Sequence, residues 1–287
     1  MSVGAVPDAD EMLIGGMGMP GRQIRAASGG RLQAGKPVAW VTDKAFSGAG
    51  AIWADLDEKP AEPGLSGYRH AEKTFRKWPG LRPFLLSGLD GGTTRPWDTG
   101  EGFSEPEDTT AIDAMDAARV LEGRWAARFP SEEELAEDEE GWRGMFAPFG
   151  ARFPSLAPAV EEELDPELMR RAVFQYTPDA RIGLVPAARP ADILFRLGWV
   201  APNQAITRPE LAVVLRSWED RFGARLLVVG FDDIRLLVSR PPRTLEAAQL
   251  IAAEHSAFSD EAHRGLRGVG EIARALVNNP FWDFWWD

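Results

Sequence analysis

Carboxylates are the most numerous side chains of this sequence that could act in acid–base chemistry. Glu219 follows a tryptophan in the segment SWEDRFG, and Asp98 and Glu101 lie in the segment RPWDTGE. Two neighbouring carboxylates can act as general acid and base if burial raises the pKa of one of them. The favoured alternative for Glu219 is a structural ion pair with Arg216 or Arg221, or a bond to a backbone amide. Glu219 is the first catalytic candidate, and the other two acids come second.

The chain has three histidines: His70, His255 and His263. The last two lie near Glu254, Asp260 and Glu261, and imidazole together with carboxylate is a ligand set for transition metals. However, His263 follows His255 by eight residues across a predicted helix end, whereas two ligands on one helix face are four residues apart. We therefore predict no metal site and a capping or surface role for the histidines. His255 is kept as the second catalytic candidate.

A glycine pattern near the amino terminus could suggest a cofactor loop. The pattern G-x-G-x-x-G occurs at Gly16, Gly18 and Gly21. A dinucleotide-binding loop needs a strand before this pattern and a helix after it, whereas here Pro20 lies inside the pattern and the next residues read as a strand. We therefore predict a flexible entry loop and no cofactor. The chain has no cysteine, which excludes disulfides, thiolate nucleophiles and cysteine-ligated zinc.

The closing segment NNPFWDFWWD is rich in aromatic residues. Its alternation would place Trp282, Phe284 and Trp286 on one face of a strand, and Phe281, Asp283, Trp285 and Asp287 on the other. An aromatic face opposite a half-charged face predicts a strand that lies on a core, although Pro280 would also suit the first position of a helix. Asp287 carries two negative groups, for which Arg240 or Arg243 are candidate partners.

A ligand or partner cleft would draw on aromatic and acidic residues. The residues predicted to line it are Trp97, Asp98, Trp218, Trp285 and Asp287. For the last of these, structural locking of the carboxyl terminus is the favoured interpretation and the cleft is the alternative, because burying a carboxylate without a partner is costly.

The elements that must position these residues fall into two predicted domains, 1–155 and 156–287. Residues 21–27 and 36–43 read as strands, 47–59 as a helix capped near Ser47, and 81–89 as a buried strand. Residues 107–129 read as one helix, with an apolar stripe made of Ile112, Met115, Val120, Leu121 and Trp125. Ser131 and Glu134 then form a capping-box pattern at the start of an acidic helix. A proline-rich stretch, 146–167, suggests the domain boundary.

The carboxyl-terminal part gives a clearer pattern. Residues 181–187 read as a strand, 189–199 as a short helix, and 207–223 as a helix with Thr207 at its cap and Gly223 at its end. Two strands around FDD follow, then helices at 244–258 and 269–279 and the closing strand. This order predicts an α+β class. It suggests a ferredoxin-like antiparallel sheet with helices on one face, preceded by a smaller α/β domain.

Charge limits the partners. The sequence has 32 lysines and arginines against 44 aspartates and glutamates, a formal net charge of −12. This field repels nucleic acid and attracts a basic protein, although acidic surfaces also serve solubility. The first residues lack the basic pattern of a signal peptide, and no apolar run is long enough for a membrane span. We therefore expect a cytoplasmic protein that binds neither membrane nor nucleic acid.

The segment from Leu215 to Phe258, together with the closing FWDFWWD, resembles an uncharacterised bacterial family, domain-of-unknown-function family 4253. The resemblance covers roughly residues 200 to 287, and the segments around 184–199 and Trp97 are similar to the longer actinobacterial members. It implies recurring residues but no catalytic roles. The recurring residues are Trp218, Glu219, Gly223, Pro241, Pro242, Phe258, Trp285, Trp286 and Asp287. The family often has Cys-Pro-Asp after Phe258, where this chain has Ser-Asp-Glu, so chemistry that needs that cysteine would be lost.

Three functions follow as hypotheses. The leading one is a non-enzymatic binding protein, immunity-like or regulatory, whose acidic surface meets a basic protein partner. The second is a hydrolase or metal-dependent enzyme that uses Glu219 and His255. The third is a small-ligand module at a cleft between the two domains.

Overall fold

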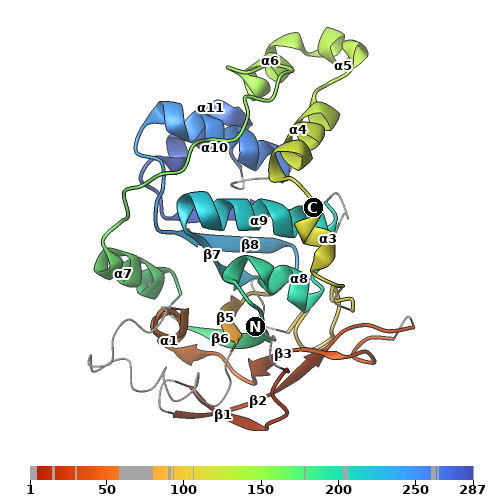
Figure 1. The fold of residues 1–287 in the computed structure, drawn as a ribbon, viewed down its shortest axis with the longest axis vertical. Helices are drawn as coiled ribbons and strands as arrows, with labels where there is room; N and C mark the ends of the chain where they lie inside the picture. Colours follow the sequence, from red (N-terminus) through yellow and green to blue (C-terminus); the bar gives the residue numbers. More distant parts are fainter. Residues whose placement is uncertain are drawn as a thin grey trace. The chain divides into compact units, whose positions relative to one another are not determined.

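The computed structural model describes residues 5–14, 17–29, 31–57, 80–89, 92, 94–105, 107–177, 179–202, 206–259, 263 and 265–286. Over these residues the protein is mixed α+β, with nine strands that pair mostly antiparallel and ten α-helices (Figure 1). Contacts group the chain into two compact units of interleaved segments. Unit 1 is 1–108, 165–202 and 226–231, and unit 2 is 109–164, 203–225 and 232–287. The predicted boundary at 155 stays a prediction.

The strands of unit 1 form a sheet in the order β1-β2-β3-β6-β5-β7, with β4 beside β6. All its pairings are antiparallel except that of β5 with β7, which is parallel. The strands are β1 (Glu11–Ile14), β2 (Met17–Arg25), β3 (Pro37–Thr42), β4 (Phe46–Ser47), β5 (Leu81–Leu86), β6 (Asp179–Pro186) and β7 (Ala224–Val229), whose last four residues belong to this unit. The strands predicted at 21–27, 36–43, 81–89 and 181–187 are thereby confirmed.

The predicted entry loop at the glycine pattern is wrong at Gly18, which lies in β2. Gly21, the first residue of the strand predicted at 21–27, lies in β2 as well. Gly21 faces Thr42 in β3, and a β-carbon at position 21 would lie 2.3 Å from the Val41 carbonyl oxygen. The glycine therefore allows close approach of two strands rather than a phosphate-binding turn. Gly16 and His70 lie outside the described residues.

Four short helical segments accompany this sheet. They are α1 (Ala49–Asp57), α7 (Pro166–Tyr176), the 3₁₀ turn η2 (Pro190–Asp192) and α8 (Ile193–Leu197). Trp53 of α1 is buried and donates its indole N–H to the Pro83 carbonyl of β5, 3.1 Å away, which fixes α1 against the sheet. Gly198 ends α8 with a φ of +68°, and a β-carbon there would overlap the Ser104 carbonyl. The sequence predicted both helical regions, at 47–59 and 189–199.

Unit 2 contains seven helices and two strands among the described residues. They are α3 (Thr110–Asp113), α4 (Ala117–Arg128), α5 (Glu132–Glu137), α6 (Glu139–Phe146), α9 (Arg208–Phe222), α10 (Leu245–Phe258), α11 (Gly268–Leu276), β8 (Asp233–Val238) and β9 (Phe281–Trp285). The predicted caps of α9 are confirmed: Thr207 and Glu210 form a capping box, and Gly223 ends the helix with a φ of +62°. The predicted capping box of Ser131 and Glu134 is confirmed as well.

One predicted helix is broken in two. The single helix expected at 107–129 is α3 followed by α4, because Asp116 adopts an extended backbone and its carboxylate accepts the Arg119 N–H at 2.9 Å. A short aspartate side chain competes for backbone amides and favours a new helix start over continuation. The apolar stripe is therefore divided: Ile112 is buried on α3, whereas Leu121 and Trp125 are buried on α4.

The closing strand β9 pairs antiparallel with β8, with Phe284 opposite Ile234. The predicted alternation of side chains is confirmed on the inner face of β9, where Trp282, Phe284 and Trp286 are each at most 1% exposed. On the outer face, Asp283 and Trp285 are half-buried. The ferredoxin-like arrangement is not confirmed. It would place β9 beside β6, whereas β9 pairs with β8 and β6 pairs with β3, β4 and β5.

Candidate functional site

Glu254 of α10 is a fully buried carboxylate at the centre of unit 2. Arg221 donates to both of its oxygens, from Nη1 at 2.8 Å and from Nη2 at 2.6 Å. The indole N–H of Trp218 and the backbone N–H of Ala157 each add a bond of 2.7 Å. A buried carboxylate is tolerated only with such complete pairing, and this bidentate geometry is the strongest form of it. Glu254 therefore ties α9, α10 and the segment before α7 together.

His255 and His263 form a buried pair beside this carboxylate. His255 is 0% exposed and His263 is 8% exposed. Nδ1 of His255 lies 3.1 Å from Nε2 of His263, and the rings are stacked at 15° with their centroids 5.3 Å apart. One ring donates this hydrogen bond to the other, so one of the two facing nitrogens carries a proton and the other nitrogen accepts it. Nε2 of His255 has no hydrogen-bond partner among the residues that the structure describes.

Burial lowers the pKa of both histidines. For His255 the pKa lies well below the usual value, first because the ring is desolvated and then because His263 and Arg221 repel a positive charge. For His263 the pKa falls to about 4, since burial outweighs the attraction of Asp283. Both rings are therefore neutral near pH 7.

Aromatic rings enclose His255. The ring centroids of Trp218, Trp282 and Phe284 lie 5.0, 4.5 and 4.8 Å from that of His255. Each of these three side chains is at most 1% exposed. The cluster of Trp218, Arg221, Glu254, His255 and His263, which we call the Glu254–His255 cluster, is thus a dry and closed arrangement, suited to holding elements together.

His263 of this cluster, together with Ser259, covers the outer edge of β9. The backbone N–H of Trp286 donates to the Asp232 carbonyl, and the Pro280 carbonyl accepts the Val238 N–H. The backbone N–H and C=O groups of the even-numbered residues of β9 therefore point toward β8, and those of the odd-numbered residues point away from it. On the outward side, the backbone N–H of His263 donates to the Asp283 carbonyl at 3.0 Å, and Ser259 Oγ donates to the Trp285 carbonyl at 2.7 Å. His263 has a φ of +56°, which is uncommon for a residue with a side chain. The edge is therefore protected by bonds within the chain.

The buried histidine pair predicts a pH dependence of stability. A histidine with a lowered pKa in the folded state is neutral there while the unfolded chain takes up protons, so stability is full above pH 6.5 and falls as the pH drops towards 4. From His263 alone we expect a loss of about 1.4 kcal/mol between about pH 7.5 and about pH 5.5, and His255 acts in the same direction. Urea unfolding at the two pH values measures the loss.

The variant His263→Asn provides the comparison, because asparagine tolerates a positive φ and does not titrate. The pH-dependent loss should shrink by about 1.4 kcal/mol in this variant. Equal losses in the wild type and the variant would show that His263 is not protonated preferentially in the unfolded chain.

The first catalytic candidate, Glu219, does not lie with His255 in this cluster. Adjacent helix residues point about 100° apart, and it is the preceding residue, Trp218, that contacts His255. Glu219 itself is partly exposed. Of its two predicted partners, Arg221 binds Glu254 and Arg216 binds Asp113 at 2.6 Å.

Sequence reasoning treated Glu254 only as a neighbour in a conceivable metal site. Its position carries a signal, since it follows Ile251 by three residues and precedes Phe258 by four, which puts a carboxylate on the apolar face of α10. A charge in that position predicts a buried ion pair. Within the described residues, no group of three or more acidic or histidine side chains is arranged to bind a metal ion.

In unit 1, the other two acidic candidates serve as anchors. Asp98 binds Arg22 of β2 and lies 3.1 Å from Nη1 of Arg181, which is 2% exposed. Arg95 makes a bidentate pair with Glu101, with both bonds at 2.8 Å, and this hydrogen bonding lowers the pKa of Glu101. A general acid needs the opposite shift.

The residues predicted to line a cleft are distributed over both units. Trp97 is fully buried in unit 1, between the rings of Phe84 and Phe103 at 5.4 and 5.1 Å. In unit 2, Trp218 belongs to the Glu254–His255 cluster, and the Trp285 indole N–H donates to Asp232 at 2.8 Å. That these residues share one cleft stays a prediction.

The predicted pairing of Asp287 with Arg240 or Arg243 lies outside the described residues. Where the structure describes them, Arg240 donates to the Asp220 carbonyl at 3.0 Å, and Arg243 donates to Asn278 at 3.1 Å.

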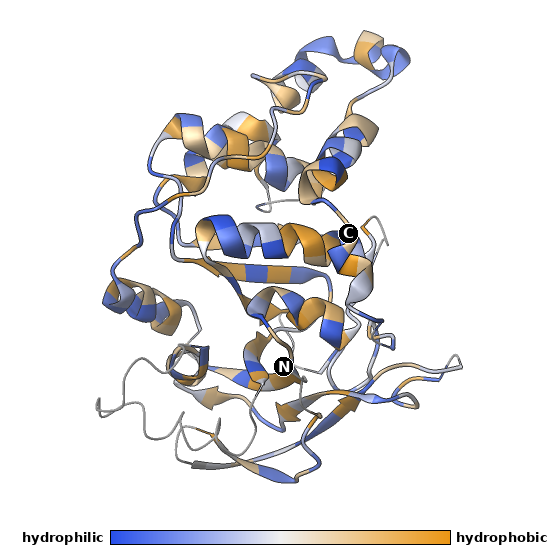
Figure 2. Ribbon diagram, viewed as in Figure 1, coloured by the Kyte–Doolittle hydropathy of each residue, from blue (hydrophilic) through white to orange (hydrophobic). Residues whose placement is uncertain are grey.

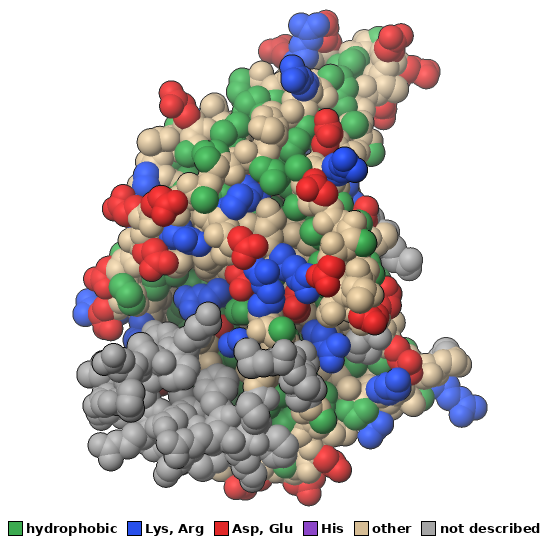
Figure 3. All heavy atoms as spheres, viewed as in Figure 1, with side chains coloured by type: hydrophobic (Ala, Val, Ile, Leu, Met, Phe, Trp, Pro, Cys, Tyr) green, Lys and Arg blue, Asp and Glu red, His purple; other side chains and the backbone are tan. Residues whose placement is uncertain are grey.

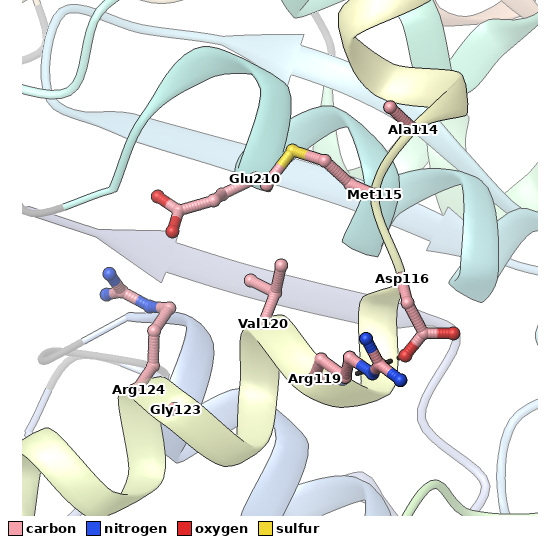
Figure 4. A pocket seen from close by; sticks show the side chains of 8 residues that line it. All are labelled: Ala114, Met115, Asp116, Arg119, Val120, Gly123, Arg124 and Glu210. Carbon is pink, nitrogen blue, oxygen red and sulfur yellow. Dashed lines mark hydrogen bonds between the residues drawn. The ribbon is translucent and has the colours of Figure 1, made fainter.

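A surface hollow of about 370 Å³ lies between the α3–α4 junction, α4 and the start of α9 (Figure 4). Its floor is apolar, with Met115 and Val120, and its charges are mixed. Asp116 already caps α4, Glu210 belongs to the capping box of α9, and Arg124 donates to the Ala257 and Phe258 carbonyls. Because most of its charged groups support helix ends, this hollow offers few uncommitted contacts to a ligand.

Comparison with known families agrees with the predicted resemblance. Residues 181–287 match the family model described as Domain of unknown function (DUF4253). No curated protein and no solved structure matches the chain. No helix among the described residues is long and apolar enough to cross a membrane.

Proposed function

We propose that this protein, whose residues 181–287 match the DUF4253 family model, is a non-enzymatic binding protein that docks a basic protein partner on an acidic face of unit 2. The face consists of α5 and α6, which we call the acidic face. As part of the same proposal, the interaction takes place in the cytoplasm and serves a regulatory or immunity-like role.

The main support for this proposal is that helix α5 buries none of its side chains. None of the α5 residues is buried, and only Phe146 of α6 is. Hydrophilic residues dominate α5 in the hydropathy view (Figure 2). Short helices are poorly stable on their own and are usually held by an apolar face. Since α5 supplies no core residue, its composition is free to serve contacts with another molecule.

The charges of this face are mostly uncommitted. Seven of the nine residues 132–140 are acidic. Glu134 and Asp138 cap helices, and Glu139 pairs with Arg143 at 2.5 Å. The other four are exposed and have no ion-pair partner among the residues that the structure describes: Glu132, Glu133, Glu137 and Glu140. In the space-filling view, acidic side chains are exposed over α5 and α6, with basic side chains beside them (Figure 3).

Such a face favours a basic protein over other partners. A concentration of one charge sign steers an oppositely charged protein and raises its association rate, while it repels nucleic acid. Half-buried Trp142, Met145 and Leu135 lie on the same two helices and would supply apolar contact area.

The proposal is tested with two variants of equal charge change. The first, Glu133→Gln/Glu137→Gln/Glu140→Gln, removes three of the seven negative charges of the acidic face and leaves both caps intact. The control, Glu122→Gln/Glu161→Gln/Glu163→Gln, removes three exposed acids elsewhere. In affinity capture from the native cell extract at low salt, the wild type and the control should retain a basic protein that the first variant loses. Equal capture by both variants, or no enrichment at all, would refute the proposal.

The enzymatic alternative has less support. It needs Glu219 and His255 to converge on a substrate, whereas His255 is enclosed by aromatic rings and hydrogen-bonded to His263. The pKa of His255 lies well below the range in which a general base works best near neutral pH.

A further inference from the structure

A second pocket of unit 2 is lined by the end of α10 and the start of α11. Its volume is about 280 Å³. The polar residues that line it are Arg128 of α4, Ser256 and Ser259 of α10, and Arg267 before α11. Met145 and Phe146 of α6 form an apolar wall. The pocket is therefore part polar and part apolar. It lies apart from the Glu254–His255 cluster and shares Met145 and Phe146 of α6 with the acidic face.

The charges in this pocket have one sign. The only charged side chains among its described lining residues are the two arginines, Arg128 and Arg267. In a protein with a net charge of −12, such a local reversal of sign marks a place where an anion is attracted rather than repelled. Guanidinium groups bind phosphate and carboxylate oxygens with two parallel N–H donors.

The two arginines differ in how firmly they are held. Arg128 is half-buried, and its Nη1 donates to the Ser256 carbonyl and, at 3.0 Å, to the Ser259 carbonyl. Arg267 is exposed, and its guanidinium has no hydrogen-bond or ion-pair partner among the residues that the structure describes. One guanidinium is thus already fixed in position, which lowers the entropy cost of binding, whereas the other must be ordered when it contacts the ligand.

A hydroxyl adds a neutral donor. Ser256 Oγ makes no hydrogen bond with the described residues, whereas Ser259 Oγ donates a hydrogen bond to the Trp285 carbonyl. The carboxylate of Glu271 accepts the backbone N–H of Arg267 at 2.8 Å, so this amide is already satisfied. An anion would therefore be recognised by side chains: two guanidiniums and the hydroxyl of Ser256.

We propose that this pocket binds the phosphate group of a small molecule, either inorganic phosphate or a small phosphate monoester. A phosphate group offers enough oxygens for both arginines and the serine hydroxyl. The apolar wall of Met145 and Phe146 leaves room for a short carbon chain beside it. The groups that would bind the phosphate itself, Arg128, Arg267 and Ser256, lie outside the acidic face.

The test uses the full-length protein in thermal-shift and calorimetric titrations at constant ionic strength. Inorganic phosphate and glycerol 3-phosphate are the probes, and sodium chloride and glycerol are the controls. We expect a saturable rise of the melting temperature with the phosphates alone, because a ligand that binds only the folded state stabilises it. Tighter binding of glycerol 3-phosphate would identify an ester as the preferred ligand, and equal binding would identify the phosphate ion.

The variants assign the site. Arg267→Gln should weaken phosphate binding by about tenfold or more, since it removes a charged hydrogen bond, and Ser256→Ala by a smaller factor. Arg274→Gln is the matched control, because Arg274 is exposed on α11 and does not line the pocket. A melting temperature that responds equally to phosphate and chloride would overturn the proposal. So would equal phosphate affinities of the two arginine variants.

Discussion

Replacing Arg221 with alanine is expected to lower the free energy of unfolding by about 3 to 5 kcal/mol. The reason is the position of its partner: Glu254 is 0% exposed, and Arg221 supplies two of its four hydrogen bonds. Without the guanidinium, a carboxylate stays buried with only the Trp218 and Ala157 donors, and the burial cost of the charge is no longer compensated. Urea unfolding monitored by tryptophan fluorescence measures the change.

Two further variants separate the charge from the packing. In Arg221→Met/Glu254→Gln the pair becomes neutral. Trp218 and Ala157 donate to different oxygens of Glu254, so the amide oxygen of the glutamine keeps one of these two bonds, and part of the lost stability should return. Arg274→Ala removes an exposed arginine of α11 and should change stability by less than about 0.5 kcal/mol. A loss below about 1 kcal/mol in Arg221→Ala would contradict the view that Glu254 is a charged, closed centre.

Deleting Trp282 to Asp287 is expected to abolish cooperative folding of unit 2. Three of the removed side chains are at most 1% exposed: Trp282, Phe284 and Trp286. Burial of each contributes about 1.5 to 3 kcal/mol, and the sum is comparable to the whole stability of a domain, about 5 to 15 kcal/mol. The deletion also removes the backbone partners of β8. Calorimetry should show the loss of a thermal transition.

Single substitutions test the same strand without removing it. Trp282→Ala should cost about 3 to 5 kcal/mol, because its ring packs on Trp218, Phe222 and His255. Trp285→Ala should cost much less, since Trp285 is half-buried on the opposite face and its main loss is the bond to Asp232. Similar costs for the two would contradict the assignment of the inner and outer faces.

Local structure could be predicted from the sequence where it depends on nearby residues. The helix start at Thr207, the helix end at Gly223 and the alternation of Trp282, Phe284 and Trp286 are all set by spacing along the chain, and all three are confirmed. The break at Asp116 was missed because the apolar spacing continued across it, while the competition of a short carboxylate for the backbone decided the outcome.

Long-range pairing could not be predicted in the same way. The parallel contact of β5 with β7 joins segments about 140 residues apart, and no local pattern specifies it. The same is true of His255 and His263, whose ring contact depends on a turn at a positive φ, and of Glu254, whose partner Arg221 lies on another helix. For this reason the sequence predicts Glu219 and His255 as a catalytic pair, whereas the structure places His255 beside Glu254 in the buried Glu254–His255 cluster.

The Glu254–His255 cluster holds unit 2 together, and we propose that the acidic face binds a basic protein. The most direct test is the salt dependence of affinity for the captured partner, measured with the wild type and with Glu133→Gln/Glu137→Gln/Glu140→Gln. We expect the wild-type affinity to fall steeply with salt, and the variant to bind more weakly with a shallower salt dependence. Equal affinities and equal salt dependences for the two proteins would contradict the claim.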